Sequence, residues 1–190
     1  MKKIILLAVS LLLLLTFSAC GGGGTPPAAS TPPPAEVPAD TLTGETVEIL
    51  AAVVAAAGEA AEAPLPQSFE DQVTAENCQG MLGLTPEQFA EYVTDAYVSN
   101  AALTTSAHEV ALVKCNDPAA AAEVKALIAE GFDSQKWVCV LPDESSVVDS
   151  GSYVLLLATS SDYAEALTAG FTALAADNTG EKIVFYTSPR

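Results

Sequence analysis

The sequence has 190 residues, which is the length of one ordinary domain or of a smaller domain with appendages. Its 24 Asp and Glu residues against 7 Lys and Arg residues give a formal net charge of −17 at pH 7. Nucleic acids and anionic membrane surfaces are bound electrostatically by clustered Lys and Arg, and the sequence contains no such cluster, so the composition excludes both kinds of partner.

Residues 1–19 have the three-part pattern of a secretory signal peptide. Lys2 and Lys3 form a positive start, residues 4–17 form an apolar stretch, and small residues lead up to Cys20. A membrane span needs roughly 18 or more apolar residues, and this stretch is shorter. We therefore expect the segment to direct export and then to be removed.

The junction Phe17-Ser18-Ala19-Cys20 resembles the lipobox of bacterial lipoproteins. In that class, cleavage leaves the cysteine as the new N-terminus, where it carries a diacylglycerol thioether. The resemblance implies that Cys20 is the lipid attachment site and that the membrane is a partner through this lipid. Two acyl chains, such as palmitate, give stable anchoring where one is marginal. The expected location is the cell membrane, with the protein lipid-anchored and facing the extracellular side; the alternative is an ordinary secretory signal followed by an incidental cysteine.

Residues 20–40 are expected to be the lipidated cysteine and a Gly/Pro-rich tether. After Cys20 the segment holds four consecutive glycines and six prolines. Such a composition cannot bury a core, so it should stay open. In the polyproline form, at ~3.1 Å per residue, it would reach on the order of 60 Å. The folded part, residues 41–190, should therefore stand away from the membrane.

The first part of that domain has helical patterns. Apolar residues recur at helical spacing over residues 44–63, and this helix should end before Pro64. The stretch 84–89, Leu-Thr-Pro-Glu-Gln-Phe, has a cap at its Thr, Pro at the first helical position and Gln for a capping box. It predicts a helix to about residue 94, preceded by another near residues 74–82.

After residue 106 the pattern alternates between strands and helices. The expected elements are a strand over 108–115, a helix capped by 116–118, a hairpin of 147–149 with 153–158, a helix from Ser160 or Ser161, and a strand over 183–187. Residues 137–141 fit either an extended segment or the end of a helix. The polar run 143–146 predicts a solvated turn, because it lacks the alternating carboxylates and the Gly of a calcium loop.

The predicted fold class is α+β, with N-terminal helices followed by a β-α-β-β-α-β, ferredoxin-like layer with a mostly antiparallel sheet. Residues 153–158 are apolar on both faces of a strand, which predicts a central strand covered on both sides. We expect the helices from residues 118 and 161 to share one face and the N-terminal helices to cover the other.

Several of these segments also carry a likeness to a known family. The segments are Leu84-Thr85-Pro86-Glu87, Ala107-His108-Glu109-Val110-Ala111-Leu112-Val113 and Gly151-Ser152-Tyr153-Val154-Leu155-Leu156. Together with the lipobox and the tether, they resemble a family of small Gram-positive bacterial lipoproteins catalogued as a domain of unknown function. The likeness covers about residues 46–174. It implies an envelope location and an α+β fold, and it brings no activity or catalytic residue with it.

The sequence offers few parts for chemistry. It lacks the P-loop, dinucleotide-binding, nucleophile-elbow and His-Glu-x-x-His motifs. With one His and no closely spaced Cys pair, a zinc site is not expected, and we expect no metal and no cofactor. His108 and Cys115 could form a nucleophilic pair, but seven residues along one strand put them on opposite faces. We therefore expect no catalytic residues. Trp137 with Phe132 fits a core aromatic cluster better than a carbohydrate-stacking platform.

Three cysteines remain after Cys20, so one intramolecular disulfide is possible. Cys115 and Cys139 are the candidates, since a returning strand could lie beside the one that Cys115 ends. Such a bridge would add about 3 kcal/mol to the free energy of unfolding on the chain-entropy model. The alternative is that these two cysteines and Cys78 are small, reduced, buried residues.

The sequence therefore predicts a non-enzymatic binding or scaffolding domain of a cell-envelope lipoprotein, whose partner is an unknown envelope protein or ligand. One alternative is an envelope hydrolase that uses carboxylates, although no spacing singles out a pair. The other is a small substrate-capturing lipoprotein. Such proteins generally close two lobes around a cleft, and residues 41–190 are too few for two sizeable domains.

Overall fold

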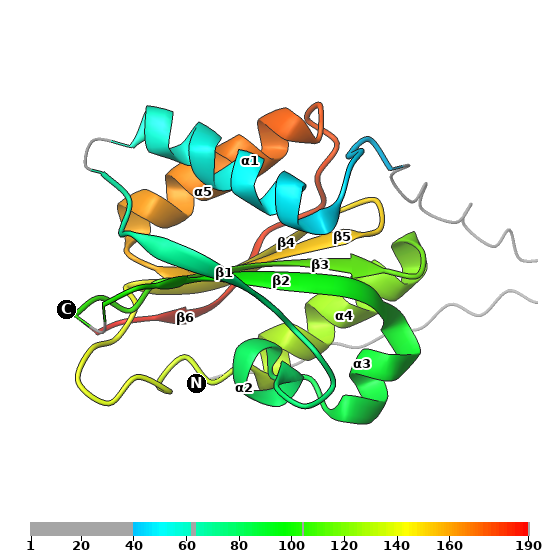
Figure 1. Ribbon diagram of the computed structural model, residues 1–190, viewed down its shortest axis with the longest axis horizontal. Coiled ribbons are helices and arrows are strands. Elements are labelled where there is room, and N and C mark those ends of the chain that lie inside the picture. Colours follow the sequence, from blue (N-terminus) through cyan, green and yellow to red (C-terminus); the bar gives the residue numbers. More distant parts are fainter. Residues whose placement is uncertain (1–39, 62–63, 104, 190) are drawn as a thin grey trace, which may run out of the picture. The chain divides into compact units, whose positions relative to one another are not determined.

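A six-stranded antiparallel sheet lies between two layers of helices in the computed structural model, which describes residues 40–61, 64–103 and 105–189 (Figure 1). The predicted signal peptide, Cys20 and nearly all of the predicted tether lie outside the described residues. In chain order the elements are α1 (Thr46–Ala60), β1 (Ser68–Gln72), α2 (Cys78–Leu82), α3 (Pro86–Tyr92), β2 (Val93–Ala101), β3 (Glu109–Cys115), α4 (Pro118–Gly131), β4 (Glu144–Ser150), β5 (Tyr153–Thr159), α5 (Ser161–Leu174) and β6 (Ile183–Thr187).

The strand order is β1-β2-β3-β5-β4-β6, and every neighbouring pair is antiparallel. The predicted α+β class with a mostly antiparallel sheet is therefore confirmed. The ferredoxin-like ordering is not, because that arrangement would place β6 beside β3. In this fold β2 pairs with that side of β3, and β6 pairs with β4 at the far edge instead.

The two crossover helices lie on opposite faces of the sheet, so the expectation that they share a face is wrong. Helix α4 packs with α2 and α3 on one face, and α5 packs with α1 on the other (Figure 1). The connection β3-α4-β4 joins two strands that are two positions apart in the sheet, and so does the connection β5-α5-β6, in the same direction across the sheet. The starting strands, β3 and β5, run antiparallel to each other. Crossovers are almost always right-handed, and this geometry then requires opposite faces.

Strand β5 is the central strand that the sequence predicts. All seven of its residues are buried, between β3 on one side and β4 on the other. Leu155 faces the core under α1 and α5, and Leu156 faces the core above α4. Both leucines are 0% exposed, so each face of the strand has its own helical cover.

The helical predictions hold with shorter bounds. The capping box at Thr85 is formed, with its side chain accepting from Gln88 N at 3.3 Å while Gln88 Oε1 accepts from Thr85 N at 2.8 Å. Helix α1 begins at Thr46 without a side-chain cap, rather than at residue 44. None of the helices in the described ranges has both the length and the apolar character that a membrane crossing requires.

Three strand segments were missed or misread from the sequence. β1 is an exposed edge strand whose structure depends on pairing with β2, and β2 has a polar sequence without clean alternation. The predicted solvated turn at residues 143–146 is wrong, because β4 begins at Glu144 and buries both Ser145 and Ser146. Pairing with β5 and β6 on both sides removes these serines from solvent.

The described chain begins beside the β4–β5 turn. The carboxylate of Asp40 accepts hydrogen bonds from the backbone N–H and the hydroxyl of Ser152. Gly151 has φ +53°, and a Cβ there would collide with Asp40. Only glycine therefore suits both the left-handed turn and the close approach of Asp40. The start of the domain is held at this end of the sheet.

Truncation of either central leucine should destabilise the domain. Leu155→Ala and Leu156→Ala each leave a cavity in one of the two cores, so each should lower the free energy of unfolding by about 2 to 5 kcal/mol. Urea unfolding monitored by circular dichroism measures both losses. Leu174→Ala, at a position that is 39% exposed, is the matched control and should cost much less. A near-neutral effect at Leu155 or Leu156 would contradict the two-sided cover.

Candidate functional site

Two adjoining cavities lie at the end of the sheet opposite the β4–β5 turn. One has a volume of about 290 Å³ and the other about 300 Å³. They share Pro66, Thr105, Ser106 and Tyr163 as lining residues, and we call the pair the His108 site. The other residues lining the first cavity are Ala107, His108, Val140, Leu141, Asp143, Thr159 and Ser160, and those lining the second are Pro64, Gln67, Ala101 and Leu103.

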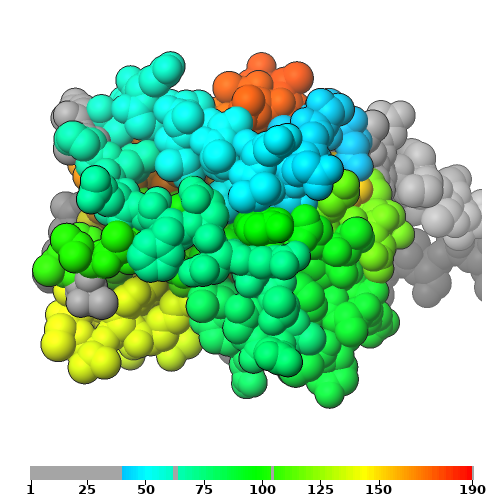
Figure 2. Space-filling model, viewed as in Figure 1, coloured from blue at the N-terminus to red at the C-terminus, as the bar shows by residue number. Residues whose placement is uncertain are grey.

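The sheet register explains why these segments meet. Ser68 pairs with Ala101, and Glu109 pairs with Ala158, so β1 and β3 begin where β2 and β5 end. Strand β4 begins at the same end of the sheet, where Glu144 pairs with Thr159. The connections at this end therefore converge. In Figure 2 the segment that follows α4 (yellow) and the β2–β3 connection (green) are both exposed on the left of the molecule.

His108 forms the buried part of the site. It precedes β3 directly and is 2% exposed, and its Nδ1 lies 2.8 Å from the hydroxyl of Thr159. Its ring makes an edge contact with Tyr163, with centroids 6.1 Å apart and an interplanar angle of 86°. The second ring nitrogen, Nε2, is buried and has no hydrogen-bond partner among the described residues.

Burial sets the charge state of this imidazole. Desolvation lowers the pKa of His108 from its ordinary 6.5 to about 4, so the ring is neutral at pH 7. A neutral imidazole has one donor and one acceptor nitrogen. Whichever role Nδ1 takes toward Thr159, the buried Nε2 is left with an unused hydrogen-bonding function.

Three hydrogen bonds hold the walls of the site. Tyr163 donates its hydroxyl hydrogen to the carbonyl of Pro64 at 2.9 Å, which ties the segment before β1 to α5. The backbone N–H of Ala102 donates to the carbonyl of Gln67 at 2.7 Å. A carboxylate oxygen of Asp143 accepts from Ser161 N at 3.4 Å, at the start of α5.

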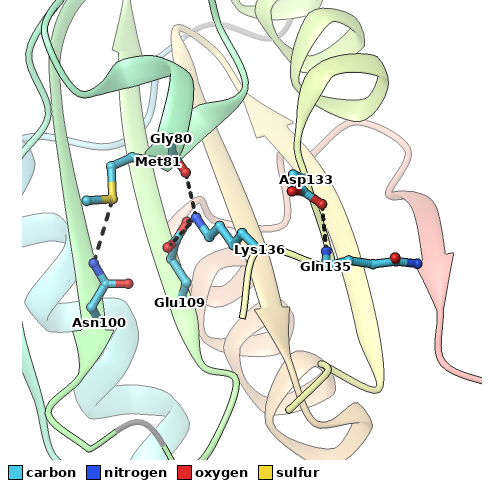
Figure 3. A network of polar contacts seen from close by, with 7 residues as sticks. All are labelled: Gly80, Met81, Asn100, Glu109, Asp133, Gln135 and Lys136. Atoms are coloured by element: carbon cyan, nitrogen blue, oxygen red, sulfur yellow. Dashed lines mark hydrogen bonds and ion pairs between the residues drawn. The ribbon is translucent and has the colours of Figure 1, made fainter. Parts of the chain in front are cut away.

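A fourth contact holds the connection between α4 and β4, which supplies Val140, Leu141 and Asp143 to the first cavity. Lys136 reaches from this connection to the carboxylate of Glu109, with Nζ 2.7 Å from Oε2, and donates to the carbonyl of Gly80 at 2.8 Å (Figure 3). Residues 108 and 109 are neighbours on an extended chain and face opposite sides. His108 therefore lines the cavity, while Glu109 holds the connection between α4 and β4 that forms part of the cavity wall.

The ion pair of Glu109 is partly desolvated. Glu109 is 2% exposed, and burial raises its pKa from 4.5 to about 6, although the ammonium of Lys136 opposes that rise. The ammonium also lies 4.5 Å from the centroid of the Phe132 ring and 5.1 Å from that of Trp137. These rings therefore contact the cation, and Phe132 is a buried core residue, as the preferred interpretation of this pair expects.

The lysines of the described chain are all engaged with other groups. Lys125 pairs with Asp149 at 2.6 Å, Lys182 pairs with Glu144 at 2.6 Å, and Lys136 pairs with Glu109. Lys114 lies over the ring of Tyr153, 5.7 Å from its centroid. None of the four lines the His108 site, whose single ionisable carboxyl group is that of Asp143.

None of the three described cysteines lines the His108 site, and none of them is bonded to another. Cys115 is buried at the end of β3, and burial raises its pKa to about 12, so it is a thiol at neutral pH. It lies about 23 Å along the strand from His108, at ~3.3 Å per residue, which excludes a catalytic pair. Cys139 is exposed between α4 and β4, and Cys78 is buried. All three are free thiols here, so the disulfide considered between Cys115 and Cys139 is not formed in this structure.

The structure does bring some carboxylates together, but in an exposed place. Glu91, Asp117 and Glu123 line an open hollow of about 600 Å³ beside α3 and the start of α4. All three are exposed. Within residues 40–61, 64–103 and 105–189, no group of three or more His, Cys, Asp and Glu side chains is placed to hold a metal ion.

The sequence singles out His108, as a residue at the start of a strand and as a possible partner of Cys115, but not the rest of the site. Nothing in its pattern indicates that Thr159, Tyr163 and residues 64–66 lie around this side chain. A local signal existed only for the start of α5, where Ser160 and Ser161 follow a strand. The other contacts join residues that are 51 and 99 positions apart, which no local pattern encodes.

Comparisons of the chain with protein-family models, with curated proteins and with solved structures find no match. What the site can do therefore has to be argued from its own geometry.

Replacing Lys136 should expose the dependence of Glu109 on its partner. Lys136→Met replaces the hydrocarbon part of lysine with an apolar chain of similar length but removes the ammonium. The buried carboxylate of Glu109 is then unpaired, so the free energy of unfolding at pH 7 should fall by about 3 kcal/mol. Because the pKa of Glu109 is raised in the folded state, protonation favours folding, and this loss should shrink between pH 7 and pH 4.5. Urea unfolding at pH 7 and pH 5 measures it. The double variant Glu109→Gln/Lys136→Met should recover most of the loss, and no recovery would contradict this account.

His108 should make the wild-type protein sensitive to acid. Its pKa is lowered in the folded state, so its contribution to stability is complete above pH 6.5 and is lost as the pH falls towards 4. The full loss is about 3 kcal/mol, from ~1.4 kcal/mol per pKa unit. His108→Asn can keep a partner for Thr159 but does not titrate, so the stability difference between wild type and variant should narrow by that amount between pH 7 and pH 4. A constant difference across this range would show that His108 is not desolvated.

Proposed function

We propose that this chain is a lipid-anchored protein of the cell envelope, and that its domain binds a small uncharged ligand in the His108 site without transforming it. The single observation that carries the binding part is the buried Nε2 of His108, which lacks a partner among the described residues and belongs to a side chain lining a cavity. An unpaired buried polar group costs about 1 to 3 kcal/mol, which a ligand group can offset.

The anchoring part rests on sequence. The signal-peptide pattern, the lipobox ending at Cys20 and the Gly/Pro-rich tether all support it, as does the resemblance to small Gram-positive lipoproteins of unknown function. The described chain adds a compatible geometry. It begins at Asp40 on the β4–β5 turn, whereas the His108 site is at the Thr159 end of β5. A membrane anchor before Asp40 would therefore connect to the domain at the end away from the site.

Binding fits the chemistry of the site better than catalysis does. The contact of His108 with Thr159 has the geometry of a base with a hydroxyl nucleophile. A general base works best with a pKa near the operating pH, and the pKa of His108 is about 4. Among the residues that the structure describes, the carboxyl group with a raised pKa is that of Glu109, which is buried and held by Lys136. Neither group is suited to proton transfer with a bound substrate at neutral pH.

The anchor is tested by fractionating cells that express the full chain. Wild-type protein should be in the membrane fraction, and Cys20→Ala should be released or left unprocessed, because the thiol that accepts the lipid is gone. Cys139→Ala is the matched control, since it removes an exposed cysteine outside the lipobox and should leave the protein in the membrane. Membrane-bound Cys20→Ala with its signal peptide removed would overturn the lipoprotein assignment.

The binding function is tested by a fragment screen on the full chain in detergent, with backbone amide shifts as the readout. A mixture of neutral, cationic and anionic fragments should give hits whose shifts cluster at residues 105–108, 140–143 and 160–163. Neutral fragments should outnumber anionic ones, because no lysine lines the site. Hits that cluster elsewhere, or no hits at all, would overturn the proposed binding function.

A further inference from the structure

The residues that line the His108 site also indicate the chemical class of its ligand. Its polar lining consists mainly of groups that can both donate and accept hydrogen bonds. These are the hydroxyls of Thr105, Ser106, Thr159 and Ser160, together with the neutral imidazole of His108. Such groups are best matched by a ligand that also both donates and accepts, and a hydroxyl group does this.

The charged groups of the domain narrow the class of possible ligands further. The domain is strongly acidic, and each described lysine is engaged away from the site. A phosphate, sulfate or carboxylate ligand would lie beside the exposed carboxylate of Asp143, and no lysine lines the site to balance the two negative charges. Like charges this close repel each other. Anionic ligands are therefore disfavoured, and Asp143 is available as an acceptor for hydroxyl hydrogens.

The apolar lining and the size of the site suit a ring. Tyr163 lines both cavities, and Pro66 and Leu141 add flat or apolar surface beside it. The two cavities, at about 290 and 300 Å³, are each at the lower end of the range for small-molecule sites. A molecule with an apolar face, several edge hydroxyls and repeating units of this size is a sugar.

We propose that the His108 site binds an uncharged oligosaccharide, with one sugar ring in each of the two adjoining cavities and Tyr163 between them. This inference rests on the proposed binding function and specifies its ligand class. A shift of the His108 ring, whose Nε2 is buried in this structure, brings that nitrogen to a ring hydroxyl in the first cavity, and another hydroxyl donates to Asp143. Thr105 and Ser106, which line both cavities, contact both rings.

The test titrates the full chain with defined probes, in a detergent that has no sugar headgroup. The neutral probes are cellobiose and maltose, the charged ones are glucuronic acid and glucosamine, and the peptide probe is acetyl-Gly-Pro-Ala-amide. A neutral disaccharide should shift the amides of residues 105–108, 140–143 and 160–163 saturably. Glucuronic acid should cause no saturable shift there.

Two matched variants assign the contact to Nε2. Asn places its amide near the position of Nδ1, whereas Gln reaches the position of Nε2. His108→Asn should therefore weaken disaccharide binding at least about tenfold, the equivalent of one hydrogen bond, and His108→Gln should retain most of it. Asp143→Asn, at an exposed position, provides a second test that does not depend on the core, and it should weaken binding severalfold.

The outcomes separate the two proposals. Saturable disaccharide binding at the site that is lost in His108→Asn supports both. Site shifts caused by the peptide, without any from the disaccharides, would overturn the sugar inference and leave the binding function standing. Site shifts from glucosamine alone would overturn the claim that the ligand is uncharged, and they too would leave the binding function standing. Disaccharide binding that is equal in wild type, His108→Asn and Asp143→Asn would also overturn the inference. No shift at the site from any probe would overturn the inference and count against the binding function as well.

Discussion

The fold depends on one constraint, which is that β5 is apolar on both of its faces. A strand of this kind can avoid water only if the sheet has a layer on each side. The chain meets this requirement with α1 and α5 over Leu155 and with α4 and its neighbours over Leu156. The right-handed crossovers from antiparallel strands deliver α4 and α5 to opposite faces, and α1 completes the layer that α5 starts. Two cores therefore lie on the two faces of one sheet, and β5 contributes to both of them, as β3 and β4 do.

The candidate site follows from the same arrangement. Because the strands are antiparallel and nearly in register at one end, four connecting segments converge beside Thr159. His108 and Glu109 occupy adjacent positions there, and the alternation of an extended chain directs them to different sides. His108 reaches the layer of α5 and contacts Tyr163. Glu109 reaches the other layer, where Lys136 ties the wall of the cavity to the sheet. The site is thus supported from both cores.

The use of lysine explains how a strongly acidic domain can hold a neutral site. Three described lysines neutralise carboxylates that are largely buried, at Glu109, Asp149 and Glu144. Without these partners, each carboxylate would be desolvated as an isolated charge, which is costly. The remaining carboxylates are mostly at the surface, where water solvates them. The described lysines therefore stabilise the fold, and none of them lines the His108 site, where it could attract an anionic ligand.

The sequence alone determined the features that depend on local pattern: the capping box at Thr85, the hairpin into β5, the helix from Ser161, the last strand at residues 183–187 and the two-sided burial of β5. These follow from spacing, caps and apolar runs over a few residues. Strands β1 and β2, the buried serines of β4 and the edge taken by β6 were decided only by tertiary structure, because their stability comes from pairing with distant strands rather than from their own composition. The His108 site belongs to this second group. Its members are brought together by sheet register, and the neutrality of His108 comes from burial, which no local pattern encodes.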